Sequence, residues 1–273
     1  VTPNTDIFLG LDEFRFNRNQ DYKFQISGPI LKDKIHFFIN VRDQVNRNHL
    51  NGIRRFNVTD SSNYYSDDPL LWVTSNTGDS SIVSMNRYYG TTILGKLSFN
   101  LLKGIRFSTL FSMDRDEGPG YDHAFKSIPD GMAAGHGKTD FFTFQWNHLL
   151  SNKMFYDLKI SQTKNYSGSY LFENPLDSNY VHDKYLESFG PGFFTGGQQK
   201  HHDTRTIDNF NVKFDFNWQI NNSHNLKTGL NFKKYDIDNS WRQIRNEYFG
   251  TPLEGQLYKP KVFGDSTLFA DVY

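Results

Sequence analysis

The chain has 273 residues, enough for one large β domain or two smaller ones. Its 30 basic and 30 acidic residues balance and no basic stripe is present, which makes a nucleic acid a poor candidate for a partner. Cysteine is absent, so a disulfide framework, a cysteine-ligated metal and a thiol nucleophile are excluded.

Aromatic residues reach 16% although hydrophobic residues make up only 37%, which is unusual for a soluble core of aliphatic side chains and typical of a barrel wall with one wet side. No apolar run approaches the roughly 20 residues of a transmembrane helix. Residues 1–20 also lack a secretory signal. Because the chain opens at Val1 without Met and stops at Tyr273 inside an apparent strand, we expect an internal piece of a longer protein, with its targeting signal upstream.

Strand-like segments follow one another along the chain, and helical periodicity is nowhere sustained. Residues 5–16 are either a further strand or the tail of a preceding domain. The nine segments after them are 22–27, 35–42, 92–101, 105–113, 141–149, 154–162, 206–220, 226–238 and 267–273. In these segments apolar and polar residues alternate, which predicts a sheet with one apolar face and one polar face.

The clearest hairpin joins 206–220 to the segment that starts at Leu226. Its first strand places Phe210, Val212, Phe214, Phe216, Trp218 and Ile220 on one face and Asn209, Asn211, Lys213, Asp215, Asn217 and Gln219 on the other. Elsewhere Phe38 and Leu110 fall on the polar side. The phase slips near Lys233 and Lys234, where we expect a β-bulge that lets Tyr235 and Ile237 continue the apolar face.

The connections alternate between short and long. The short ones, at 28–34, 102–104, 150–153 and 221–225, are rich in turn residues. The long ones, at 43–91, 114–140, 163–205 and 239–266, are polar, and so many long loops argue against a compact soluble domain.

Tight turns at one rim, long loops at the other and two-faced strands predict an all-β fold, an antiparallel transmembrane β-barrel wall in an up-and-down meander with long extracellular loops. Strands of about ten residues cross a bilayer at the usual tilt. Nine strands do not close a bacterial barrel of even strand number, so we expect the missing wall to come from residues outside this chain.

Several patches resemble the TonB-dependent outer-membrane receptors, in particular the Bacteroidetes-like branch. They are Ser27 to Ile30 followed by Lys32 to Lys34 and Phe37-Phe38, then Gly190 to Gly197, Asn225 to Phe232, and Lys259-Pro260 leading to Phe269 to Tyr273. The resemblance covers most of the chain through loose motifs, and it carries no information on the substrate.

The resemblance implies a barrel of about 22 strands with a plug in its lumen. Residues 1–20 would be the end of the plug or a first barrel strand, and 21–273 would be a partial barrel. The implied protein sits in the cell outer membrane, in contact with lipid. It captures an extracellular ligand, a siderophore, vitamin, glycan or peptide, and takes it up with energy from the TonB complex, which acts through a plug upstream of this chain.

Candidate metal sites are weak, and we assign no metal and no cofactor. The run Asp114 to Gly118, with Asp122 after it, has the alternating carboxylates of a calcium loop but lacks the full ligand pattern, so a solvated loop is the favoured interpretation. His201 and His202 are adjacent and point apart on a strand. The further loop histidines His123, His136 and His182 are more often solvated than ligands.

Aromatic residues of the predicted loops are candidates for stacking on a ligand, or for packing loops together and lining the headgroup girdle, which is the interpretation we favour. They are Tyr64, Tyr65, Trp72, Tyr88, Tyr89, Trp241 and Tyr248. Trp146, Trp218 and Tyr156 lie on apolar faces and are expected to anchor the wall in lipid.

No catalytic arrangement is recognised, so we do not expect an enzyme. Gly78-Asp79-Ser80 and Gly264-Asp265-Ser266 each place a serine after Gly-Asp, but neither has the strand-to-helix setting of a nucleophile elbow. The alternatives to a receptor are a soluble β-sandwich that binds carbohydrate and a passive porin. A sandwich would bury its apolar faces between two sheets, and a porin would lack an upstream plug.

Overall fold

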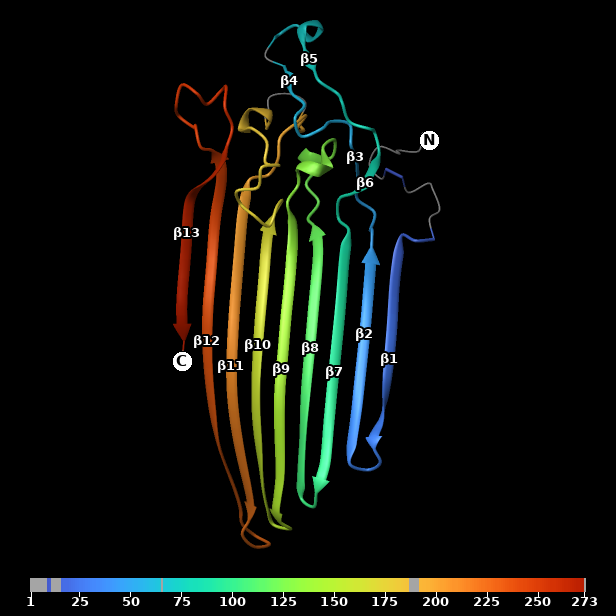
Figure 1. Cartoon of the computed structure of the whole chain (residues 1–273), viewed down its shortest axis with the longest axis vertical. Coiled ribbons are helices and arrows are strands. Elements are labelled where there is room, and N and C mark those ends of the chain that lie inside the picture. The colour runs from blue at the N-terminus through green and yellow to red at the C-terminus, as the bar shows by residue number, and fades with distance from the viewer. Residues whose placement is uncertain (1–8, 11–15, 65, 187–191, 273) are drawn as a thin grey trace.

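The computed structural model describes residues 9–10, 16–64, 66–186 and 192–272, the last nine of these by their backbone. Nine long strands form one antiparallel sheet in which every strand pairs with its predecessor and successor among them (Figure 1). In spatial order they are β1 Asn19–Leu31, β2 Ile35–Asn46, β7 Tyr88–Leu102, β8 Ile105–Pro119, β9 Ala134–Ser151, β10 Met154–Tyr170, β11 His201–Gln219, β12 Asn225–Asn246 and β13 Pro260–Val272.

The remaining elements belong to the long connections, which gather at one end of the sheet, while the short turns lie at the other end (Figure 1). Two small ribbons pair β3 Asn51–Ile53 with β6 Ile82–Ser84 and β4 Ser62–Asn63 with β5 Val73–Thr74. Four 3₁₀ turns complete the set, namely η1 Pro69–Leu71, η2 His123–Phe125, η3 Pro129–Gly131 and η4 Asp183–Tyr185. Among the described residues, no helix is long and apolar enough to cross a membrane.

The nine predicted strands and their order are confirmed, but most strands reach further into the loop end than the alternation indicates. The segment 141–149, for example, is part of the 18-residue strand β9. In the added parts polar side chains occupy both faces, and cross-strand polar contacts replace apolar ones. Arg115 contacts the Asp140 carboxylate at 2.6 Å, and the Thr139 hydroxyl donates to the Asn165 side-chain oxygen at 3.0 Å. Backbone pairing therefore continues where the hydrophobic signal has ended.

The strand register collects the apolar side chains on one face. Residues directly opposite each other in an antiparallel pair point to the same side. One such row crosses seven strands and consists of Phe37, Leu97, Thr109, Phe144, Ile160, Val212 and Phe232. Rings on neighbouring strands also contact each other, as Phe99 and Phe107 do with centroids 4.5 Å apart. Trp146, Trp218 and Tyr156 lie on this apolar face, as predicted.

The apolar band does not run at right angles to the strands. On β8 it ends at Met113, whose partner on β9 is already Asp140. On β9 it ends at Phe142, whose partner on β10 is Gln162. From β8 to β10 the end of the band thus moves towards the short turns. A band of constant height requires this shift when strands are tilted, as they are in membrane barrels.

The predicted bulge at Lys233 and Lys234 is wrong. Pairing of β11 with β12 runs without a register shift from Gln219 opposite Asn225 to His201 opposite Gln243. Tyr235 lies opposite Asn209, so Tyr235 and Ile237 belong to the polar face. The exceptions on the polar side, Phe38 and Leu110, are confirmed there and lie in one row on either side of Lys96.

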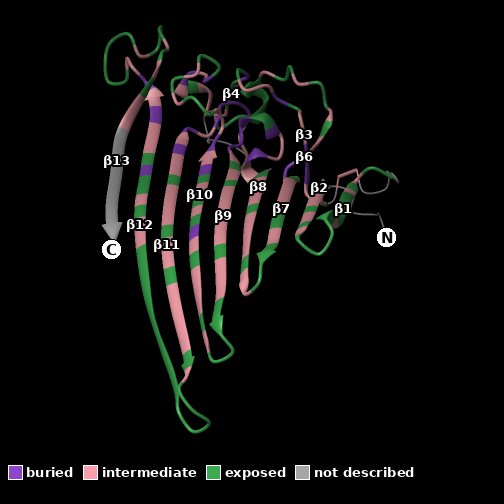
Figure 2. Ribbon diagram, turned by 60° about the horizontal axis from the view of Figure 1, so that its bottom comes forward, coloured by how far each residue is buried: buried purple, intermediate pink, exposed green. Residues whose placement is uncertain are grey.

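No second sheet covers the apolar face within the described part of the chain, because the other two sheets are short loop ribbons. Large apolar side chains remain exposed along the band, for example Leu230 at 77% and Phe232 at 51%. The first half of β12 pairs only with β11 and is exposed on both faces (Figure 2). The β-sandwich alternative, which needs a second sheet against this face, is therefore wrong.

Burial is concentrated at the loop end instead (Figure 2). Two long connections form a hydrophobic cluster of their own, consisting of Phe56, Met85, Phe125, Ile128 and Met132, and a third packs Leu186, Phe193 and Phe194 against it. The connections are thus packed together and hold a fixed shape above the sheet.

The assignment of faces predicts that an arginine on the apolar face of β11 lowers the stability of the protein, whereas an arginine on the polar face does not. Phe214→Arg places a charge in the middle of the apolar band, and on a lipid-facing barrel position this costs about 2–4 kcal/mol. Asn217→Arg, on the polar face of the same strand, serves as the matched control and is expected to be tolerated. Urea unfolding in lipid vesicles measures the difference. Equal midpoints for the two variants would contradict the assignment.

Candidate functional site

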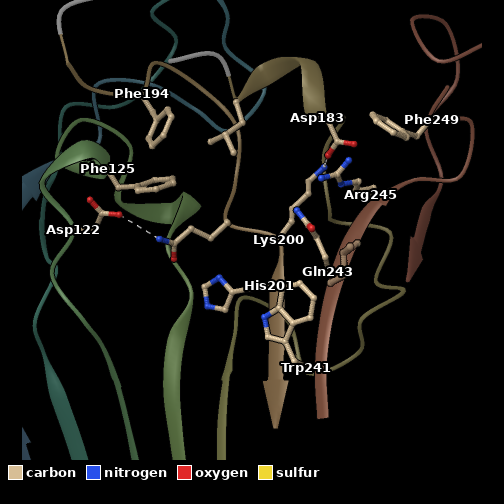
Figure 3. Close-up of a pocket in the computed structure, with 13 residues that line it drawn as sticks. Asp122, Phe125, Asp183, Phe194, Lys200, His201, Trp241, Gln243, Arg245 and Phe249 are labelled. Atoms are coloured by element: carbon tan, nitrogen blue, oxygen red, sulfur yellow. Dashed lines mark hydrogen bonds and ion pairs between the residues drawn. The ribbon is translucent and has the colours of Figure 1, made fainter. Parts of the chain in front are cut away.

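A pocket of about 550 Å³ lies where the loops meet the upper ends of β11 and β12 (Figure 3). We refer to it as the loop-end pocket. Its walls come from three places: the polar-face side chains of β11 and β12, the turn around Phe125 with the segment at Phe194, and the segment that carries Asp183 and Lys200. The pocket therefore combines aromatic rings with charged groups, as small-ligand sites do.

Strand β12 supplies the floor of the loop-end pocket through alternate residues. Trp241, Gln243 and Arg245 follow the phase of Tyr235 and so project from the polar face. Among the described residues, neither the indole N–H of Trp241 nor the Gln243 carboxamide has a hydrogen-bond partner. The Arg245 guanidinium stacks on the Phe249 ring, 4.9 Å from its centroid, and has no carboxylate partner there. Three adjacent groups able to donate hydrogen bonds thus face the cavity uncommitted.

The opposite wall is held by aromatic and polar contacts. The rings of Phe125 and Phe194 contact each other with centroids 4.7 Å apart, and Phe125 is only 3% exposed because it belongs to the loop cluster. Gln199 fixes the base of this wall, since its side-chain oxygen accepts from the Ala133 amide at 2.8 Å and its NH₂ group lies 3.4 Å from the Asp122 carboxylate. These contacts hold the aromatic side of the pocket in place.

The third wall depends on a buried cation. The Lys200 ammonium donates to the Asp183 carboxylate, to the Val181 carbonyl and to the Tyr258 hydroxyl. Burial lowers the pKa of Lys200, and the pairing with Asp183 opposes that effect. Burial likewise raises the pKa of Tyr258.

Asn246 completes this arrangement. Its backbone N–H donates to Asp183 at 3.0 Å, and its side-chain amide donates to the Leu257 carbonyl at 2.7 Å. We call the group of Lys200, Asp183, Asn246 and Tyr258 the Lys200 clasp. It joins the connection 171–200 to the connection 247–259 and to the end of β12.

Removal of the clasp cation is expected to loosen both connections. Lys200→Met keeps the length of the side chain but leaves Asp183 without its ion pair, which costs about 1.5–3 kcal/mol for a charged hydrogen bond. Hydrogen exchange should then increase in 171–200 and 247–259 and remain unchanged in β8 and β9. Lys164→Met, at an exposed position of β10, is the control. Unchanged exchange in both connections would show that the clasp does not hold them.

The glycine pair in the patch 190–197 has a steric role. A Cβ on Gly196 would collide with the Asp60 carbonyl, and Gly197 adopts a φ of +83° directly against Leu186. Asp60 is itself buried and accepts hydrogen bonds from the Asn57 and Thr77 amides, each at 2.9 Å. The close approach lets the chain carry Phe194 into the pocket wall.

Gly196→Ala is therefore expected to displace Phe194 and to open the pocket. Gly255→Ala is the matched control, because a Cβ there meets no atom within 4 Å. Thermal unfolding and proteolysis of the connection 171–200 report the effect. A variant Gly196→Ala as resistant to protease as Gly255→Ala would contradict this role.

Of the aromatic candidates from the sequence, Trp241 is the one that lines the loop-end pocket. Trp72 instead packs edge-on against Tyr64, with centroids 5.3 Å apart, and donates to the Ser66 carbonyl. Tyr88 and Tyr89 begin β7, and Tyr248 follows β12. Tyr65 lies outside the described residues. Packing within the loops, the favoured interpretation, thus holds for Trp72 and Tyr64.

The histidines do not converge on a metal site. His201 lines the pocket and contacts the Ser169 hydroxyl at 3.0 Å, whereas His202 points to the other face and stacks on Tyr170 at 4.7 Å, as adjacent strand residues should. His136 stacks on the far side of Tyr170 at 4.3 Å. No cluster of three or more His, Asp or Glu groups fit for a metal occurs among the described residues.

His123 and His182 are also occupied elsewhere. His123 contacts the Tyr121 hydroxyl at 2.8 Å, and His182 accepts from the Lys184 amide at 3.0 Å.

The acidic run 114–118 is a strand rather than a solvated loop, so that expectation is wrong. It forms the end of β8, where Asp114 and Asp116 share one face and Glu117 lies on the other. The Asp114 carboxylate accepts from the Thr92 hydroxyl at 2.6 Å. A calcium loop would bring these carboxylates together around one ion, whereas the strand holds Glu117 on the opposite face from Asp114 and Asp116.

The two Gly-Asp-Ser runs have structural roles in a loop contact and in a strand. Hydrogen bonds from the Ser81 side chain and the Ser81 amide, with a smaller contribution from Arg54 at 3.1 Å, lower the pKa of Asp79 to about 2. Gly264 to Ser266 lie within β13. Of residues 5–16, where a further strand or a domain tail is expected, the structure describes Leu9, Gly10 and Phe16, which lie in turns, and the others lie outside the described residues.

Sequence reasoning missed Gln243, Arg245, Lys200 and Asp183. No motif marks them. Gln243 and Arg245 can be located from the alternation of side chains between the two faces of β12. Without the predicted bulge, this alternation places Trp241, Gln243 and Arg245 on the same face as Tyr235.

A scan against protein-family models finds no match, and a search of curated proteins finds none by sequence. Among solved structures, the outer membrane transporter YddB from Escherichia coli matches with a TM-score of 0.57 and 11% identity. The match covers 93% of this chain and 30% of YddB, so the chain spans about a third of the length of that transporter. At this identity the likeness concerns the fold, and it identifies the sheet as a partial antiparallel transmembrane β-barrel wall.

Proposed function

We propose that the chain is the wall segment of an outer-membrane receptor that takes up a small extracellular ligand with energy from TonB. The observation that carries the proposal is the position of the loop-end pocket. It opens on the polar face, which in a membrane barrel faces the lumen, and it lies at the rim with long loops, which faces outwards. A ligand held there stands at the entrance of the lumen.

The packed loops support reception of a ligand in preference to passive flow. The cluster around Phe125 and the Lys200 clasp give the entrance a defined, chemically mixed wall. A site formed in advance binds with a smaller entropic cost than mobile loops would. Energy coupling is the part of the proposal that rests on the resemblance of the patches at 27–38, 190–197 and 225–232 to TonB-dependent receptors.

Conductance separates the proposed receptor from a porin. The full-length protein, reconstituted in planar lipid bilayers, is expected to show no steady ion current, because a plug fills the lumen of a receptor of this class. Direct binding to the periplasmic domain of TonB from the same organism is expected as well. Stable open steps without TonB binding would establish the passive porin instead.

Trp241 is predicted to contribute to uptake. In a strain that lacks the gene and grows poorly on the nutrient concerned, the Trp241→Ala protein should require about tenfold more nutrient, equivalent to 1.4 kcal/mol of binding. Trp72→Ala, at the tip of another loop, is the control and should restore normal growth. Full rescue by Trp241→Ala would show that the ligand does not use this pocket.

A further inference from the structure

Two cations stand directly opposite each other at the edge of the loop-end pocket. Arg245 on β12 pairs in register with Lys261 on β13, so their side chains leave the sheet on the same side. Arg245 lines the pocket, and Lys261 is exposed beside it. Like charges at directly opposed strand positions repel each other, and such a pair is unfavourable unless an anion compensates it.

The nearby carboxylates are already engaged. Glu247, one step along the same face, pairs with Lys259 at 2.7 Å. The hydrogen bond from Lys259, with a smaller contribution from Lys261, lowers the pKa of Glu247. Asp183 is held by Lys200 and by the Asn246 amide. Within the described residues, neither Arg245 nor Lys261 has a carboxylate within ion-pair distance.

The β12–β13 edge of the pocket therefore carries more positive than negative charge, whereas Asp122 adds one carboxylate on the opposite, aromatic wall. Two carboxylates, Asp183 and Glu247, face the four cations Lys200, Lys259, Arg245 and Lys261. The first two cations are neutralised, and the last two are left over. A guanidinium offers paired N–H groups that match the two oxygens of a carboxylate or phosphate, and a neighbouring ammonium strengthens the binding of that group.

The spacing of Trp241, Gln243 and Arg245 along β12 also sets the shape of the ligand. Alternate residues on a strand are about 6.6 Å apart, so Trp241 and Arg245 are separated by about 13 Å along the strand. Gln243 lies between them, with a carboxamide that both donates and accepts. A ligand that uses all three groups is elongated and has an acidic end, a polar middle and a flat or ring-shaped end that lies against the indole.

We infer that the loop-end pocket binds an acidic small ligand whose anionic group bridges Arg245 and Lys261 and whose ring lies on Trp241. The inference rests on the proposed function and adds the class of ligand to it. Free carboxylates and phosphate monoesters both supply the anionic oxygens that this binding requires.

Three fluorescent probes that differ in charge test the inference. They are 4-methylumbelliferyl glucuronide, 4-methylumbelliferyl glucoside 6-phosphate and the neutral 4-methylumbelliferyl glucoside, each titrated against the full-length protein in detergent. At least one acidic probe should bind tenfold or more tightly than the glucoside, with an affinity that falls as salt is added. The comparison between glucuronide and phosphate tells which acidic group is the better fit.

Single substitutions then assign the effect. Arg245→Gln and Lys261→Gln are each expected to abolish the preference for the acidic probe while binding of the glucoside stays the same. Lys227→Gln removes the same charge from the same face of β12 at the short-turn end and should change nothing. Each substitution relieves a repulsion and gives up one weak contact, that of Arg245 with the Phe249 ring or that of Lys261 with the Phe263 ring. Because these effects oppose each other, neither Arg245→Gln nor Lys261→Gln should lower the urea midpoint of the free protein appreciably. A loss of binding that comes together with a lower midpoint would indicate a structural role and overturn the inference.

Other results also decide the question. Equal affinity for acidic and neutral probes, or binding of none of them, overturns the acidic-ligand inference. If uptake of a neutral nutrient depended on Trp241, the acidic-ligand inference would be overturned as well, but the proposed receptor function would stand. Conversely, selective binding of acid by a protein that conducts ions and ignores TonB would remove the proposed function and keep the inference.

Discussion

The structure depends on one constraint: the apolar face of its single-layer sheet must be shielded from water. In a water-soluble protein, a face of Phe, Leu, Val and Trp side chains would be covered by a second layer. Here the described chain provides no such layer, and side chains such as Leu230 remain exposed along the band. Lipid is the solvent that removes this cost, and the limited thickness of the bilayer core also explains why the band gives way to ion pairs such as that between Arg115 and Asp140.

The loop end follows a different logic, because there the protein must provide its own core. The connections bury Phe56, Met85 and Phe125 among themselves, and the Lys200 clasp attaches two of them to the sheet. Such loops cost more conformational entropy than short turns. The same packing creates a pocket on the polar face, so the feature that makes the loops stable also gives them a surface fit for recognition.

Much of the wall was predictable because a period of two is a strong signal on strands with one apolar face. The signal ends where both faces become polar, which is why the upper parts of β8, β9 and β10 were assigned to loops. It also misled at Lys233, where two apolar residues, Tyr235 and Ile237, lie on the polar face and imitate a bulge. The loop-end pocket was largely out of reach, because the opposition of Arg245 and Lys261 depends on the pairing of β12 with β13, which no local pattern encodes.

The most direct test of the account is solvent accessibility along β11. The chain has no cysteine, so single cysteines at positions 210 to 218 can each carry a spin label without background. In lipid vesicles, labels at even positions should collide with oxygen, which dissolves in lipid, and labels at odd positions with a water-soluble nickel complex, so that accessibility oscillates with a period of two. Equal exposure of both sets to the nickel complex, or burial of the even positions from both reagents, would contradict the account.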